Sequence, residues 1–201
     1  FNDLLNEGIM PNVTLDISPV LCEQLEAPEF KEIFIHYCDA RIDAARKDHL
    51  DFLHWGYDPH HIWLTEFWEN FYASRKNDFI EKYNQSIVGA LRDLQNKNAI
   101  EVMTCGATHG YLPLLGTDES INLQIATAVE NYEKFFGRYP RGIWLPECAY
   151  RPGYDWQSLI PVSPFNEKHY RPGIEQFLYK HNLEYFVIDE KLIQNSTPIG
   201  A

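Results

Sequence analysis

The sequence predicts an α/β domain with parallel strands, and two observations support this fold class. Four short runs rich in apolar, β-branched or aromatic residues have the length of buried strands. They cover residues 13–17, 100–104, 142–145 and 185–188. A helical pattern or its remnant precedes each run, and alternating helices and strands are typical of a parallel sheet. With 201 residues, of which 45% are hydrophobic, the chain can bury one sizeable core.

The helical patterns have recognisable ends. They cover residues 1–8, 78–96, 118–136 and 172–182. Asp118 and Glu119 lie in the first turn of their helix, where negative charge favours the helix dipole, and Gly137 follows its last turn. Residues 1–8 look like the tail of a helix that ends at Gly8, so we expect the chain to be part of a longer protein.

Residues 19–78 form a segment that is too long for an ordinary connection and too apolar for a linker. We expect a mainly helical elaboration of the one domain that spans residues 1–201. Its many aromatic residues have two interpretations, a hydrophobic core or platforms on which sugar rings stack, and the core is the commoner use. The proline-rich residues 161–172 are expected to form a loop.

Charge and cysteine content exclude several classes of protein. The chain has 17 Lys and Arg against 29 Asp and Glu, a net charge of −12, so neither nucleic acid nor an anionic membrane surface is an expected partner. The 4 cysteines are widely spaced and form no CxxC pair, which favours reduced thiols in the cytoplasm. No run approaches the length of a membrane helix.

Glu147 is the strongest candidate for a catalytic group. In parallel α/β folds, ligands bind beyond the carboxyl ends of strands, and Glu147 directly follows the third predicted strand. Its carboxylate is therefore expected beside Trp144 and Tyr150. The alternative is a structural ion pair between Glu147 and Arg151.

His109 is the second candidate, because it lies in a glycine-flanked loop after the second strand. Its imidazole could donate to a sugar hydroxyl or bind a metal, and the alternative is a loop histidine bonded to a backbone carbonyl. The other histidines show no metal-ligand spacing. Nucleotide-binding, serine-hydrolase and zincin motifs (GxGxxG, GxxxxGK[ST], GxSxG and HExxH) do not occur.

Four motifs, TLDISPVL, GATHGYLPLL, GIWLPECAYRPG and YFVID, closely resemble glycoside hydrolase family 57 in sequence and order. The resemblance covers nearly the whole chain and is greatest for the glycogen branching enzyme subgroup. It implies part of an incomplete (β/α)7 barrel, no metal or other cofactor, and retaining chemistry on α-1,4-glucans such as amylose and glycogen.

The resemblance also implies roles for individual residues. Glu147 matches the nucleophile of the family's third motif, and His109 matches a histidine that lines the donor glucose site. We further expect Tyr111, Trp144 and Arg151 to bind substrate. The family's opening His-x-Pro strand would precede Phe1, and its acid/base aspartate would follow Ala201. We therefore expect the chain alone to be inactive.

Several alternatives remain open at this point. Within the family, α-amylase and 4-α-glucanotransferase use the same nucleophile as the branching enzyme. A catalytically silent glucan-binding barrel is a non-enzymatic alternative. A metal-dependent polysaccharide deacetylase would need an aspartate and two histidines at a strand end, and the sequence shows no such arrangement.

Overall fold

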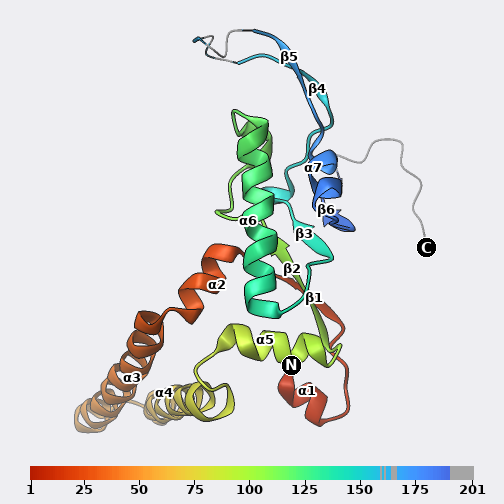
Figure 1. The fold of residues 1–201 in the computed structure, drawn as a ribbon. Helices are drawn as coiled ribbons and strands as arrows, with labels where there is room; N and C mark the ends of the chain where they lie inside the picture. The colour runs from red at the N-terminus through yellow and green to blue at the C-terminus, as the bar shows by residue number, and fades with distance from the viewer. Residues whose placement is uncertain (159, 161, 164–166, 191–201) are drawn as a thin grey trace. The chain divides into compact units, whose positions relative to one another are not determined.

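The computed structural model describes residues 1–158, 160, 162–163 and 167–190 (Figure 1). Its helices are α1 (Asn2–Asn6), α2 (Pro19–Glu26), α3 (Pro28–Trp55), α4 (Pro59–Asn77), α5 (Ile87–Asn96), α6 (Asp118–Phe136) and α7 (Ile174–Lys180). Its strands are β1 (Val13–Asp16), β2 (Ile100–Cys105), β3 (Gly142–Trp144), β4 (Tyr154–Trp156), β5 (His169–Arg171) and β6 (Tyr185–Val187). The chain forms two compact units, one of residues Glu23–Ala90 and one of Phe1–Cys22 with Leu91–Ala201.

The four predicted strands pair into one parallel sheet in the order β1-β2-β3-β6. The prediction of an α/β fold with parallel strands is confirmed. Because all four strands run the same way, their carboxyl ends meet at one edge of the sheet. In register, Cys105 at the end of β2 pairs with Trp144 at the end of β3, which pairs with Val187 of β6.

Helix α6 supplies much of the core that holds this sheet. Its apolar residues recur at helical spacing and are buried: Ile121, Ile125, Ala128, Val129, Tyr132 and Phe136. Of these, Ile121, Ile125 and Val129 form one cluster with Ile143 of β3, Leu145 directly after β3 and residues of α7. The packing of α6 against the sheet therefore holds the carboxyl edge in place.

The bounds of α6 coincide with the predicted residues 118–136 because both ends carry local signals. Thr117 accepts a hydrogen bond from the backbone N–H of Ser120 and caps the first turn. Gly137 ends the helix in the left-handed conformation, with φ of 66°.

Two sequence-based expectations are wrong. The predicted helix 78–96 is interrupted: a π-helical turn, Asp78–Lys82, is followed by Asn84 and Gln85 at positive φ before α5 begins. Residues 161–172 were expected to form a loop, but their last residues form β5, which pairs antiparallel with β4. Figure 1 shows this hairpin leaving the sheet at its carboxyl edge.

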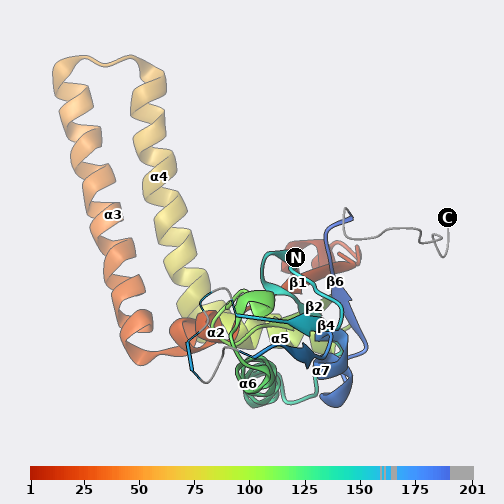
Figure 2. The ribbon, with the colours of Figure 1, turned by 90° about the horizontal axis from the view of Figure 1, so that it is seen from above.

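The unit Glu23–Ala90 contains an antiparallel pair of long helices, α3 and α4, which lie side by side in Figure 2. Ion pairs Arg46–Glu69 at 2.7 Å and Lys76–Asp39 at 2.6 Å join them. Phe79 is buried and its ring lies 4.8 Å from that of Phe34, so some aromatic residues form a core. Four aromatic residues of α4 are exposed within this unit instead: Trp63, Phe67, Trp68 and Phe71.

Within the described part of the chain, no helix combines the length and apolar character that a membrane span requires.

Candidate active site

Glu147 lies in a tight turn immediately beyond β3. Pro146 confines the preceding residue, Leu145, to an extended conformation (φ −68°, ψ 123°). The backbone N–H of Cys148 then donates to the Leu145 carbonyl at 2.7 Å and closes the turn. The side chain of Glu147 is 72% exposed, so its carboxylate is accessible at the carboxyl edge.

The backbone at this edge is strained. Eight described residues other than glycine have positive φ, and five of them are Asn or Gln. Asparagine tolerates the left-handed region, because its short polar side chain hydrogen-bonds locally. The other three are His109 (56°), Glu147 (59°) and Cys148 (53°), which all belong to the two predicted site loops. Such strain costs about 1–3 kcal/mol per residue and clusters at functional sites.

The structure brings the two principal candidates together. Nε2 of His109 lies 3.5 Å from Oε1 of Glu147. On its other side, the imidazole Nδ1 lies 3.2 Å from Sγ of Cys105, the last residue of β2. His109 therefore bridges a buried thiol and an exposed carboxylate. Glu147 faces His109, and the ion pair with Arg151 that we considered is not what orients it.

Close backbone approach makes this pairing possible. A Cβ atom added to Gly106 would lie 3.1 Å from Cγ of Pro146, so the loop with His109 contacts the loop with Glu147 at a glycine. Gln124 of α6 fixes the first loop from behind, because its side chain accepts from the backbone N–H of Thr108 and donates to the Thr108 hydroxyl, both at 2.9 Å. The two loops are thus held by glycine contact and by α6.

Two of the predicted substrate-binding residues, Trp144 and Tyr111, are close to Glu147 and His109 in sequence. Trp144 is the last residue of β3 and is half-buried. Tyr111 follows His109 by two residues and is 46% exposed. Both rings belong to the loops or strand ends of the carboxyl edge, and their binding role stays a prediction.

Arg151 is placed differently from the other candidates. It is only 8% exposed, and its Nη1 donates to the carbonyl oxygen of Pro172 at 2.7 Å. Burial, and then the neighbouring charge of Arg171, lower the pKa of Arg151. Its guanidinium thus contacts the base of the β4–β5 hairpin, and its predicted contact with substrate stays untested.

Sequence reasoning missed the contribution of Cys105 and Asp16 to this edge. Burial, and then the charge of Asp16 at the end of β1, raise the pKa of the Cys105 thiol to about 12. Cys105 is fully buried and precedes the GATHGY motif, so it looked like a packing residue. Its four-residue separation from His109 was the available signal.

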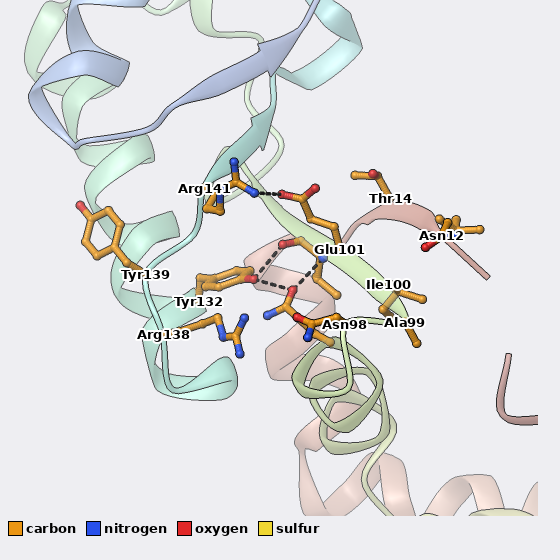
Figure 3. Close-up of a pocket in the computed structure, with 13 residues that line it drawn as sticks. Asn12, Thr14, Asn98, Ala99, Ile100, Glu101, Tyr132, Arg138, Tyr139 and Arg141 are labelled. Atoms are coloured by element: carbon orange, nitrogen blue, oxygen red, sulfur yellow. Dashed lines mark hydrogen bonds and ion pairs between the residues drawn. The ribbon is translucent and has the colours of Figure 1, made fainter. Parts of the chain in front are cut away.

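A separate pocket of about 370 Å³ lies at the opposite end of the strands (Figure 3). Here the Tyr132 hydroxyl donates to the Val102 carbonyl at 2.7 Å, and Gln95 accepts from the backbone N–H of Val102 at 2.7 Å. Arg141 pairs with Glu184 at 2.9 Å beside it. These contacts join α5 and α6 to β2, and the amino ends of barrel strands generally serve stability. This pocket is therefore not the candidate active site.

Comparisons with known proteins show the family of the chain. The profile of glycosyl hydrolase family 57 matches residues 6–198. The chain belongs to glycosyl hydrolase family 57. It is 40% identical over 195 residues to a 1,4-α-glucan branching enzyme from Thermococcus kodakarensis, across 96% of this chain and 27% of that relative.

Two solved structures extend the comparison. The branching enzyme of Pyrococcus horikoshii has a TM-score of 0.83 at 38% identity, covering 92% of this chain and 33% of that one. The α-amylase AmyC of Thermotoga maritima has a TM-score of 0.72 at 26% identity, covering 91% and 32%. The parallel sheet matches part of the incomplete (β/α)7 barrel of the glycosyl hydrolase family 57 branching enzymes, as predicted. The chain spans about 27% of the length of the curated relative.

Proposed function

We propose that this family 57 chain carries the catalytic nucleophile of a retaining α-glucan enzyme, a 1,4-α-glucan branching enzyme of glycogen biosynthesis. The observation that carries the proposal is the exposed Glu147 carboxylate on a strained turn, with His109 3.5 Å away. The 40% identity with a branching enzyme supports the specific reaction. We further propose a cytoplasmic location, supported by four free cysteines, three of them buried.

In this proposal, Glu147 attacks the anomeric carbon of an α-1,4-linked glucose. The bond to the leaving 4-oxygen breaks as a glycosyl ester forms on the carboxylate. A second carboxyl group about 5 Å away protonates the leaving oxygen. The 6-hydroxyl of another glucan then displaces the ester, returns its proton to that group and forms an α-1,6 branch.

The neighbours of Glu147 suit this chemistry. His109 can hydrogen-bond one carboxylate oxygen or a donor glucose hydroxyl, which would leave the other oxygen free to attack. Tyr111 and Trp144 offer ring faces that pack against the apolar face of a sugar. Aromatic walls of this kind would hold an acceptor glucan and exclude water, which favours transfer over hydrolysis.

The main rival within the family is α-amylase activity, favoured by the 0.72 TM-score with AmyC. A 4-α-glucanotransferase and a silent glucan-binding barrel are further alternatives. The deacetylase alternative gains no support, because no group of three potential metal ligands converges among the described residues.

The decisive experiment incubates the full-length protein and its Glu147→Gln variant with amylose and counts α-1,6 linkages and reducing ends separately. We expect new α-1,6 linkages with few new reducing ends, and a loss of about 10³-fold or more in the variant. Glu130→Gln, on the solvent face of α6, makes the same charge change and is the matched control. Reducing ends alone would indicate an amylase, and no reaction with wild type would favour the binding barrel.

A further inference from the structure

We propose that Cys105 is a positioning residue, whose thiol proton holds His109 in the tautomer that carries its hydrogen on Nε2, facing Glu147. The inference deepens the proposed function and rests on it for its catalytic consequence. The tautomer itself is independent of any reaction.

The first argument is that the His109 imidazole lies between two partners. Sγ of Cys105 lies 3.2 Å from Nδ1 of His109, within the hydrogen-bond range of sulfur, and Nε2 of His109 lies 3.5 Å from Oε1 of Glu147. The two nitrogens of one imidazole thus face two different partners. A neutral imidazole has a single N–H, so the partners decide which nitrogen carries it.

The second argument is a count of donors and acceptors. A carboxylate only accepts hydrogen bonds, so it favours an N–H at Nε2 over a lone pair. With the hydrogen on Nε2, Nδ1 becomes an acceptor and requires a donor. The thiol of Cys105 is a weak donor in its protonated form, and it fills this role.

The third argument is that the Cys105 thiol stays protonated. The residue has 0% exposure. Burial, and then the charge of Asp16, raise its pKa to about 12 against the opposing influence of the Gly106 backbone N–H. At neutral pH the sulfur therefore holds its proton and can donate it towards Nδ1.

The consequence lies at Nε2. Its N–H can donate to Glu147 or to a glucan hydroxyl, whereas the other tautomer would present a lone pair to the carboxylate. His109 also has a φ of 56°, so the ring is held on a constrained backbone. Cys105 fixes the direction of the hydrogen bond without touching the substrate.

The test measures ring ¹⁵N chemical shifts of histidine-labelled full-length protein, with the His109 signal assigned by its loss in His109→Gln. Wild type and Cys105→Ser, which retains a donor, should show the Nε2–H tautomer, and Cys105→Ala should show a mixture. The kcat on amylose should fall about fivefold to tenfold in Cys105→Ala at unchanged KM, and Cys105→Ser should recover most of it.

Several outcomes would overturn the inference. An Nδ1–H tautomer in wild type does so independently of Cys105→Ala, even if that variant does not fold. An unchanged tautomer in folded Cys105→Ala does so as well. If Glu147→Gln keeps branching activity while the tautomer responds to Cys105→Ala, the proposed function fails and the positioning role stands.

Discussion

Single residues place the two candidate loops in contact at the carboxyl edge. Three strained residues, His109, Glu147 and Cys148, lie in these loops, and a glycine allows the loops to touch. The sequence singled out Glu147 and His109 as candidates, because both follow predicted strands. Their mutual distance and the thiol of Cys105 depend on how separate loops fold back, which no local pattern reports.

Replacing Gly106 tests whether loop contact positions the site. A Cβ at this position would lie 3.1 Å from Pro146 and would push the two loops apart by a few tenths of an ångström. We expect Gly106→Ala to lower kcat about tenfold, since small misplacements of catalytic groups are costly. The measurement is steady-state kinetics on amylose with thermal unfolding as a check on folding.

Gly110→Ala is the matched control for that variant. A Cβ at Gly110 would meet its nearest atom at 3.7 Å, which is ordinary contact. Equal effects of the two substitutions would contradict the positional argument.

The buried thiol of Cys105 also predicts how stability depends on pH. Its pKa rises from the usual 9.0 to about 12 on folding, so above pH 9 the unfolded chain releases a proton that the folded chain keeps. The buried thiol makes its full contribution to the free energy of unfolding below pH 9. This contribution is lost as pH rises from 9 to about 12, by up to about 1.4 kcal/mol per pH unit. Denaturant unfolding of wild type and Cys105→Ala between pH 8 and pH 11 measures this slope, which should be shallower in the variant; equal slopes would refute it.

The sequence predicted helices whose ends carry local signals, but it did not predict the antiparallel pair of short strands, β4 and β5. Helix α6 was predicted to its last residue, because Asp118 and Glu119 mark its first turn and Gly137 follows its last. The β4–β5 hairpin was missed, because its strands have three residues each and pair across a long connection. Two buried arginines hold the base of this hairpin, and only the folded chain brings them together.

Asp118 holds the β4–β5 hairpin in place through a buried ion pair with Arg171 of β5. Nε of Arg171, which is 1% exposed, donates to Oδ1 of Asp118 at 2.7 Å, and its Nη1 donates to the Leu115 carbonyl at 2.8 Å. Asp118→Ala leaves the buried Arg171 without its carboxylate partner, so we expect a loss of about 3 kcal/mol in the free energy of unfolding. Chemical denaturation of the full-length protein measures it.

Lys168→Ala is the control for the anchor. Lys168 pairs with Asp155 at 3.2 Å on the same hairpin, but both side chains are more than half exposed. Such surface pairs contribute about 0–1 kcal/mol, so this variant should stay close to wild type. A larger effect for Lys168→Ala than for Asp118→Ala would contradict the role of the buried pair.

For the whole molecule, the sequence predicted the family and the fold, but it did not predict which faces of the helices in the unit Glu23–Ala90 are exposed. The motifs implied part of a (β/α)7 barrel, and the sheet with its family neighbours confirms it. For Trp63, Phe67, Trp68 and Phe71 in α4, exposure in this unit departs from the core interpretation. Amphipathic spacing shows that a helix has an apolar face, but it does not say what covers that face.

The central claim is that Glu147 forms the glycosyl-enzyme bond, and covalent trapping tests it most directly. The full-length protein is incubated with a fluorinated maltosyl fluoride that slows breakdown of the ester, then digested and analysed by mass spectrometry. We predict one glycosyl ester, on the peptide that carries Glu147, and none in Glu147→Gln. An ester on another carboxylate, or turnover with inverted configuration and no ester, would contradict the account.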